Sequence, residues 1–320
     1  MAGGLRQQEL SLPTMDNRPL RKRIKYASIY WSVRFMIFLS GLVPRRLWLA
    51  FFGWLGKVAY AFPSVYKERV IFHLGLAFSR ELSMKEILAL SKRVYVMIGK
   101  NAGDIIRSRN AKTLEDLDKF ITVHGYENFE AAAAKEKGVI FLTGHLGAFD
   151  LQITVMSMRG LKPNIIGTPL KDDRLNDLLF DFRNAHGAVA VERGKETFRL
   201  IKALKSKGSV AILIDQDTKV KSRFVNFFGM PAATPVGATV LAMKTGAAVV
   251  PTFIYLGDDH NQHMEILPEI PLELTGDEEK DLVSNTQRFT HVIEEAIRRH
   301  PDQWVWLHER WKTKPGEEIL

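Results

Sequence analysis

The chain has 320 residues, of which 46% are hydrophobic and only 13 are proline, so it can fold around a substantial core and is not intrinsically disordered. It contains no cysteine, which excludes disulfide bonds, thiolate catalysis and cysteine-based zinc sites. Lysine and arginine exceed aspartate and glutamate by 45 to 36, and the resulting charge of +9 suits an anionic partner such as nucleic acid, anionic lipid or an acidic carrier protein.

The N-terminal region contains a basic tail followed by two apolar runs. Residues 1–26 are polar, basic and without pattern, which predicts a flexible tail. The runs at 27–43 and 47–62 are each shorter than the ~20 apolar residues that span a bilayer. Aromatic residues lie beside basic ones here, as at a membrane headgroup boundary. We therefore predict membrane-anchor helices over 27–62, as an interfacial anchor, a tilted span or a hairpin; two core helices of a soluble domain are the alternative.

The remainder, 63–320, is interpreted as one domain with a helical lead-in over 64–112 and an α/β core over 120–320. Apolar residues at helical spacing characterise the lead-in. In the core, short apolar runs alternate with amphipathic stretches, which predicts a mostly parallel central sheet flanked by helices. The predicted strands are 121–124, 139–143, 164–167, 188–191, 210–215, 249–255 and 264–267, and the predicted helices are 127–136, 149–159, 173–185, 195–206, 235–245 and 280–299. No strand has the aromatic and basic alternation of RNA-binding modules, so no nucleic-acid partner is predicted.

His145 and Asp150 are the first candidate catalytic residues. They follow the predicted strand 139–143 and border the predicted helix 149–159, where ligands of open α/β sheets bind. A carboxylate that hydrogen-bonds one imidazole nitrogen leaves the other nitrogen to take a proton from a substrate hydroxyl. We predict that His145 is a general base oriented by Asp150; a purely structural histidine is the alternative.

Two further predicted strand ends carry polar residues. Arg193 follows the strand 188–191, and Arg183 lies on the helix before it. A guanidinium offers paired donors to phosphate oxygens, so both arginines are candidate phosphate ligands, with surface ion pairs as the alternative. Asp215 and Asp217 follow the strand 210–215; they could bind a metal, orient the base or contact sugar hydroxyls, and helix capping is the alternative. Two aspartates and one histidine are weak grounds for a metal site, and none is predicted.

Two aromatic segments come later in the chain. Residues 223–231 are interrupted by glycine, which predicts a loop that wraps an acyl chain or touches the membrane, or else a packed connection. Residues 303–312 alternate aromatic and polar side chains, which is typical of a late strand or an interfacial segment.

Five ordered blocks resemble the bacterial lipid A late acyltransferases, the lauroyl and myristoyl transferases of the lysophospholipid acyltransferase-like superfamily. The resemblance runs from about residue 30 to about residue 315. It is carried by residues 125–128 with 143–150, by Arg183, Gly187, Arg193 and Gly194, by 215–217 with 227–231, by Val250 and Pro251, and by 304–312.

This resemblance implies an O-acyltransferase. The enzyme would move a fatty acyl group from an acyl carrier protein or coenzyme A thioester to a hydroxyl of an anionic membrane glycolipid, in first place a lipid A precursor. It implies no cofactor and no metal, with His145 as base, Asp150 orienting it, and Arg183, Arg193, Asp215 and Asp217 binding substrate. It also implies a bacterial inner-membrane location with the catalytic domain facing the cytoplasm.

Within the first block this chain departs from the family pattern. Many late acyltransferases have Asn, Trp and Glu where Ala148, Phe149 and Asp150 stand here. The departure extends the possible acceptors to another glycolipid or a lysophospholipid. Two other classes are also considered: a catalytically silent membrane adaptor that binds glycolipid, and a metal-dependent phosphohydrolase that uses His145, Asp150, Asp215 and Asp217.

Overall fold

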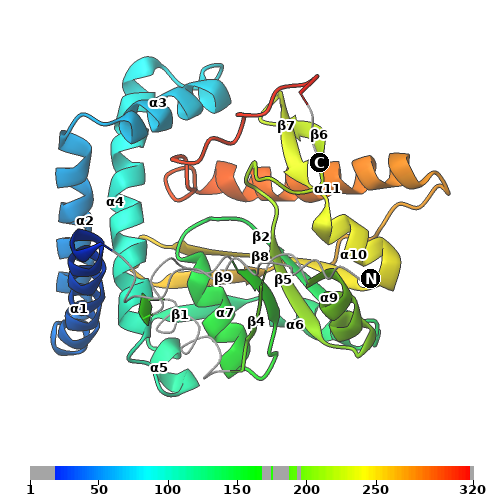
Figure 1. Cartoon of the computed structure of the whole chain (residues 1–320), viewed down its shortest axis with the longest axis horizontal. Coiled ribbons are helices and arrows are strands. Elements are labelled where there is room, and N and C mark those ends of the chain that lie inside the picture. The colour runs from blue at the N-terminus through cyan, green and yellow to red at the C-terminus, as the bar shows by residue number, and fades with distance from the viewer. Residues whose placement is uncertain (1–18, 168–173, 176–186, 193–195, 318–320) are drawn as a thin grey trace, which may run out of the picture.

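The fold begins with a set of helices around a long α4. The structure is a computed structural model that describes residues 19–167, 174–175, 187–192 and 196–317. Its first helices are α1 (Leu20–Leu42), α2 (Arg45–Ala61), α3 (Val65–Phe78), α4 (Met84–Ser108) and α5 (Leu114–Asp118). Helix α2 packs along α4, and both stand at one side of the sheet (Figure 1). Helices α3 and α4 both lie within the predicted lead-in, 64–112.

Helix α1 begins earlier than the sequence suggested. The predicted tail extended to residue 26, but residues 20–26 form the first turns of α1. Lysine, arginine and leucine dominate this stretch and are good helix formers. Pro19 precedes it, and proline is tolerated where a helix starts because the first N–H groups have no intrahelical partner.

One seven-stranded sheet organises the rest of the chain. Its order is β1-β9-β8-β2-β5-β3-β4, and the five strands from β8 to β4 are parallel. Strands β9 and β1 form an edge that runs antiparallel to the other five. The strands are β1 (Ile121–His124), β2 (Val139–Thr143), β3 (Asn164–Gly167), β4 (Val189–Glu192), β5 (Ser209–Leu213), β8 (Ala248–Leu256) and β9 (Gln262–Ile266). The predicted α/β class with a mostly parallel sheet is confirmed.

Helices cover both faces of this sheet. Along β2, Ile140 and Leu142 belong to a core shared with α11, whereas Val139 and Phe141 face a second core shared with α7. This alternation follows from the two-residue period of a strand, and both faces are apolar because both are covered. The core helices are α6 (Tyr126–Ala133), α7 (Phe149–Met158), α9 (Glu196–Lys205), α10 (Gly237–Thr245) and α11 (Glu278–Arg299). The predicted helix 173–185 lies almost wholly outside the described residues.

The aromatic segment 223–231 is a β-hairpin and not a loop. Strand β6 (Ser222–Phe227) pairs with β7 (Met230–Pro235) in an antiparallel ladder that lies over α11. Phe228 and Gly229 both have positive φ at the turn, 54° and 78°, as a two-residue hairpin turn requires. The sequence reading missed the hairpin because a phenylalanine stands where this turn usually has Asn or Gly.

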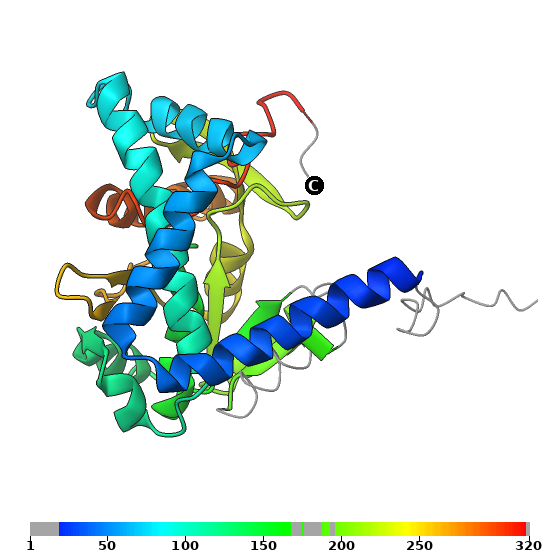
Figure 2. The ribbon, with the colours of Figure 1, turned by 90° about the vertical axis from the view of Figure 1, so that its left-hand side faces the viewer.

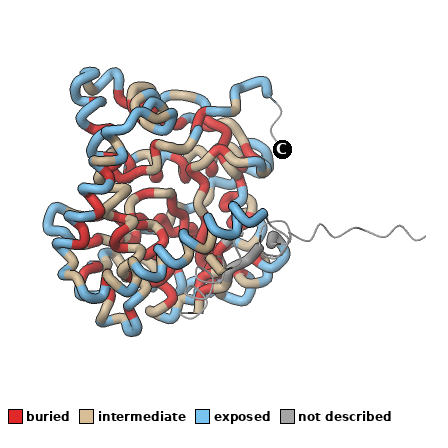
Figure 3. The backbone as a smooth tube through the Cα atoms, turned by 60° about the vertical axis from the view of Figure 1, so that its left-hand side comes forward, coloured by how far each residue is buried: buried red, intermediate tan, exposed pale blue. Residues whose placement is uncertain are grey.

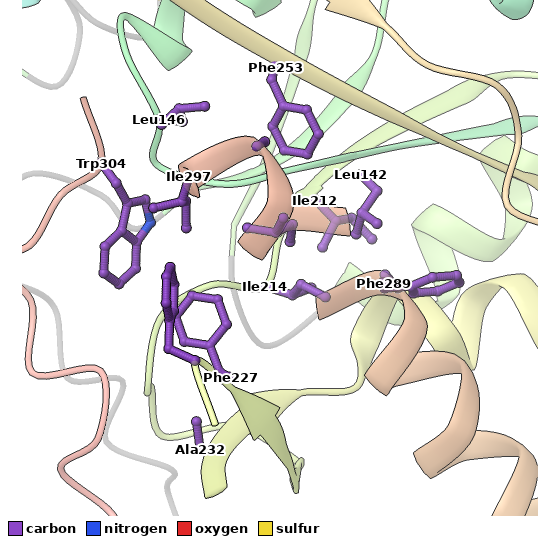
Figure 4. Packing of buried hydrophobic residues seen from close by; sticks show 14 of the residues in the cluster. Leu142, Leu146, Ile212, Ile214, Phe227, Ala232, Phe253, Phe289, Ile297 and Trp304 are labelled. Atoms are coloured by element: carbon purple, nitrogen blue, oxygen red, sulfur yellow. The ribbon is translucent and has the colours of Figure 1, made fainter. Parts of the chain in front are cut away.

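The second aromatic segment is buried and is neither a regular strand nor an interfacial segment. Trp304 and Trp306 are fully buried beside Phe227, and Trp304 makes only an isolated bridge to Leu146. Figure 4 shows the indole of Trp304 beside Ile297 of α11 and near Phe227 of the hairpin. We call residues 303–313 the C-terminal segment.

The N-terminal helices are tied to the sheet by buried polar contacts. Arg45 donates Nε–H to Asp104 Oδ1 at 2.9 Å and Nη2–H to Oδ2 at 2.6 Å, and Gln262 of β9 donates to the same Oδ2 at 2.9 Å. Asn101 links Gln262 to Gln303 of the C-terminal segment. The start of α2 is therefore held to both α4 and the sheet.

Candidate active site

His145 and Asp215 meet at the carboxyl edge of the parallel sheet. His145 follows β2, and Asp215 follows β5. These two strands are neighbours, with Thr143 in register with Leu213. Because they are parallel, the residues that follow them emerge at the same edge, where open α/β sheets bind their ligands.

Asp215 is the carboxylate that bonds the imidazole. His145 Nδ1 lies 2.8 Å from Asp215 Oδ1, and the backbone N–H of His145 donates to Oδ2 at 2.7 Å. An ionised carboxylate only accepts hydrogen bonds, so Nδ1 carries the proton and Nε2 has the lone pair. The imidazole side chain is 22% exposed. This arrangement leaves Nε2 as the nitrogen that can take a proton from a bound hydroxyl.

Asp215 is ionised at neutral pH. Burial alone would raise the pKa of this 2% exposed carboxyl. The electrostatic attraction of the His145 imidazole and the hydrogen bonds donated by His145 and Trp304 outweigh burial and lower the pKa of Asp215 to about 2. Gly144 permits the close approach, because a Cβ there would lie 3.0 Å from Asp215 Oδ2.

The sequence predicts that Asp150 hydrogen-bonds one ring nitrogen of His145. This prediction is corrected, because the carboxylate at Nδ1 is that of Asp215. Asp150 lies in the first turn of α7 and accepts from Arg109 Nη2 at 2.8 Å. Arg109 caps α4, so the guanidinium is brought to Asp150 by the helical lead-in. The assignment of Asp215 to substrate binding is corrected as well, because its two oxygens are occupied by donors of the protein.

Asp217 also bonds the protein itself. Its carboxylate accepts from Thr313 N at 2.8 Å and from Thr313 Oγ1 at 3.0 Å, and the residue is 7% exposed. These contacts make it an anchor for the C-terminal segment, and its predicted substrate contact stays a prediction. Arg183 and Arg193 lie outside the described residues. Among the residues that the structure describes, no three His, Asp or Glu side chains come together as a metal site.

The C-terminal segment completes the loop that carries His145. Gly147 donates its N–H to Gln303 O at 2.8 Å, and Val305 donates to His145 O at 3.2 Å. Trp304 Nε1 donates to Asp215 Oδ2 at 2.7 Å. The ring of Phe149 meets the imidazole edge-to-face, with centroids 4.8 Å apart. Sequence reasoning missed Trp304 and Phe149 as site residues; the dense aromatic content of 303–312 was the available signal for Trp304.

Gly147 is a position where no other residue fits. Its φ is +59°, and a Cβ there would lie 2.1 Å from the carbonyl oxygen of Ile254. Gly147→Ala is expected to lower the free energy of unfolding by about 3 kcal/mol or more, because backbone strain and a clash with β8 act together. Thermal unfolding followed by circular dichroism measures this.

Gly229→Ala is the matched control. Gly229 also has positive φ, +78°, but no atom lies within 4 Å of the point that a Cβ would occupy. The strain alone should cost about 1 kcal/mol. Equal destabilisation by both substitutions would contradict the role given to the contact between Gly147 and Ile254.

Comparison with known proteins shows what the whole chain is similar to. Residues 16–313 match the family described as bacterial lipid A biosynthesis acyltransferase. The chain is similar to a lipid A biosynthesis acyltransferase of Haemophilus influenzae, with 26% identity over 91% of each chain. It is 29% identical to a lipid A biosynthesis palmitoleoyltransferase of Escherichia coli over 63% of this chain and 65% of that protein. It is 26% identical to a phosphatidylinositol mannoside acyltransferase of Mycobacterium tuberculosis over 64% of each chain.

Proposed function

Because the chain belongs to the bacterial lipid A biosynthesis acyltransferase family, we propose that it transfers a fatty acyl group from an acyl carrier protein or coenzyme A thioester to a hydroxyl of a lipid A precursor. The observation that carries the chemistry is the His145–Asp215 pair at the carboxyl edge of the sheet. It is the arrangement of a general base whose second nitrogen faces an acceptor hydroxyl.

The proposed reaction needs no nucleophile from the protein. His145 Nε2 takes the proton of the acceptor hydroxyl while the hydroxyl oxygen attacks the thioester carbonyl. The new C–O ester bond forms, the C–S bond breaks, and the departing thiolate takes the proton back from the imidazolium. Asp215 stays ionised throughout and stabilises the imidazolium. The Gly147 N–H is already donated to Gln303, so it does not stabilise the oxyanion.

The acceptor is proposed to be anionic. Arg183 and Arg193 retain their proposed role as phosphate ligands, since guanidinium matches phosphate oxygens in pairs. A second candidate acceptor is a mannosylated phosphatidylinositol, favoured by the similarity to the mycobacterial enzyme, whose identity to this chain equals that of the H. influenzae protein. Both acceptors carry phosphate and sugar hydroxyls, which suit a general base and phosphate-binding arginines.

We further propose that α1 lies on an anionic membrane, on the cytoplasmic side of the bacterial inner membrane. Within the described residues, no helix has both the length and the hydropathy to cross a bilayer. Helix α1 runs along the outside of the molecule (Figure 2), and most of its surface is open (Figure 3). An apolar stripe at positions three, four or seven apart is exposed along it: Leu20, Ile24, Trp31, Phe35, Phe38 and Leu42. Arg21, Lys22, Arg23 and Lys25 near its start suit anionic headgroups.

Removing three aromatic rings from this stripe should weaken membrane binding. The combined change Trp31→Ala, Phe35→Ala and Phe38→Ala is expected to lower partitioning onto vesicles of anionic phospholipid roughly hundredfold, because the buried apolar area falls. Vesicle co-sedimentation measures it. Phe198 and Leu274, which are 79% and 63% exposed elsewhere on the molecule, provide control substitutions to alanine. Unchanged partitioning of the triple variant, or a shift in its oligomeric state alone, would contradict the proposal.

An acyl-transfer assay tests the proposed function. The purified protein is incubated with a Kdo-lipid A precursor and with fatty acyl thioesters of acyl carrier protein or of coenzyme A, and the lipid is analysed by mass spectrometry. A mass gain of one acyl group is expected. A gain only on mannosylated phosphatidylinositol would favour the second acceptor. Binding of both lipids with no gain on either would contradict the proposal and support the silent adaptor.

A further inference from the structure

Trp304 is a fully buried residue whose polar atom contacts the proposed catalytic pair. It is 0% exposed, and its Nε1–H donates to Asp215 Oδ2 at 2.7 Å. Its backbone forms a bridge with Leu146, the residue directly after His145. The indole and the catalytic loop are therefore fixed to each other twice, once through the side chain and once through the main chain.

We propose that Trp304 is a positioning residue, whose indole N–H orients the Asp215 carboxylate so that Oδ1 points at His145 Nδ1. The same hydrogen bond limits how strongly the carboxylate stabilises the protonated form of the imidazole. The inference rests on the proposed role of His145 as general base. Oδ2 takes two donors, the His145 backbone N–H and the Trp304 indole, which leaves Oδ1 for the imidazole. Two donors on one oxygen fix both the position and the rotation of the carboxylate.

The indole also shares the negative charge of Asp215. A buried carboxylate that loses one donor is less well stabilised and attracts the proton on the imidazole more strongly. Without the indole N–H, the imidazolium would then persist to higher pH, and less neutral base would be available at a given pH. The consequence is an upward shift of the acidic limb, the pH range over which kcat/KM rises as His145 loses its proton. Loss of a purely structural tryptophan would not cause this shift.

Other charged groups near the pair are common to every variant in the test. Asp217 lies on the same loop as Asp215, and His308 and Arg310 lie on the C-terminal segment, where both interact electrostatically with Asp215. Arg310 is fully buried and donates to Ala233 O and to Thr234 Oγ1 of β7. The substitutions below change none of these groups, so their contribution to the acidic limb cancels in the comparison.

Trp306 is a closely matched control. It is also 0% exposed, belongs to the same core, and lies edge-to-face on Trp304 with ring centroids 4.6 Å apart. Its Nε1–H donates to Pro301 O at 2.7 Å and makes no bond to Asp215. A change to phenylalanine at either position removes one indole N–H and part of one buried ring, but only the change at 304 removes a donor from the carboxylate.

The experiment compares the pH dependence of kcat/KM for wild type, Trp304→Phe and Trp306→Phe, with substrate titrations at each pH. Trp304→Phe is expected to move the acidic limb upward by about one pH unit and to lower kcat at pH 7 by about tenfold, with KM unchanged. Trp306→Phe should lower the unfolding temperature to a similar extent and leave the limb in place. An unmoved limb in Trp304→Phe, or equal shifts in both variants, would overturn the inference.

An isosteric replacement removes the dependence on ring size. Benzothienylalanine incorporated at position 304 puts sulfur where the N–H stands and keeps the shape of the indole, so the core stays packed even if Trp304→Phe fails to fold. The same upward shift is expected. If wild type transfers no acyl group, the proposed function fails, and if His145→Gln keeps the wild-type rate, the assignment of the base fails. If wild type is active, His145→Gln is inactive and the isostere leaves the limb unmoved, only the inference about Trp304 fails.

Discussion

Replacing His145 with glutamine is expected to lower the acyl-transfer rate by about 10²–10⁴-fold, the usual contribution of a positioned general base. Glutamine keeps a polar group of similar reach that can bond Asp215, but it has no nitrogen lone pair to take the hydroxyl proton. The variant should remain folded, because the imidazole is partly exposed and fills no apolar core position. The rate of acyl transfer to the lipid acceptor, followed by mass spectrometry, measures the effect.

His291→Gln serves as the control for this substitution. His291 lies on α11 with its side chain 63% exposed, next to Glu295 of the same helix. A histidine in that position has no contact with the catalytic loop, so the rate should not change. Turnover by His145→Gln at the wild-type rate would contradict the assignment of the base, and the protein would then use another group.

Replacing Asp215 with asparagine should be nearly as damaging, with a loss of about 10³-fold in rate. The amide has one accepting oxygen, whereas the carboxylate accepts from three donors: His145 N, His145 Nδ1 and Trp304 Nε1. One donor must then face an amide N–H, and the imidazole loses both its fixed tautomer and the negative charge that stabilises its protonated form. Single-turnover kinetics with a thioester donor give the rate, and circular dichroism reports the fold.

The pH dependence of stability is a second test of Asp215→Asn. Since the pKa of Asp215 is about 2 in the folded protein, below its ordinary value of 3.8, the ionised carboxylate stabilises the fold above pH 4. Wild type should lose this contribution only as pH falls from about 4 toward 2, and the asparagine variant should lack that part of the acid sensitivity.

Asp217→Asn is the control that separates catalysis from anchoring. Asp217 is buried and two residues away, yet it bonds Thr313 and not the imidazole. The substitution should loosen the C-terminal segment and lower the unfolding temperature, with a loss in rate of about tenfold or less. Equal losses in rate for the two asparagine variants would contradict the assignment of Asp215 as the carboxylate that orients His145.

Local sequence patterns were sufficient to place His145. The apolar run 139–143 is buried on both faces and ends where a parallel strand must end, so the residue after it had to lie at the ligand-binding edge. The partner of His145 was harder to identify. Asp150 is near in sequence, but which strand lies beside β2 depends on the order of the sheet, and no local pattern states that β5 is that neighbour.

The C-terminal segment was misread for a related physical reason. An alternation of aromatic and polar residues normally marks a strand with one buried face. Here two of the polar residues are also buried: Arg310 donates to β7, and Gln303 bonds both the N–H and the carbonyl of Leu256. Polar side chains that satisfy distant backbone groups cannot be recognised from spacing, since their partners are set by tertiary packing.

The pairing of the C-terminal segment with the catalytic loop has a consequence for how the protein is made. His145 leaves the ribosome long before Trp304, and at about 5–20 residues per second the interval is roughly ten to thirty seconds. During that time the loop lacks the bond from Gly147 to Gln303 and Asp215 lacks its indole donor. The nascent chain therefore carries both residues of the catalytic pair well before it carries the segment that holds them in place, so the pair is not held in place until that segment has been synthesised.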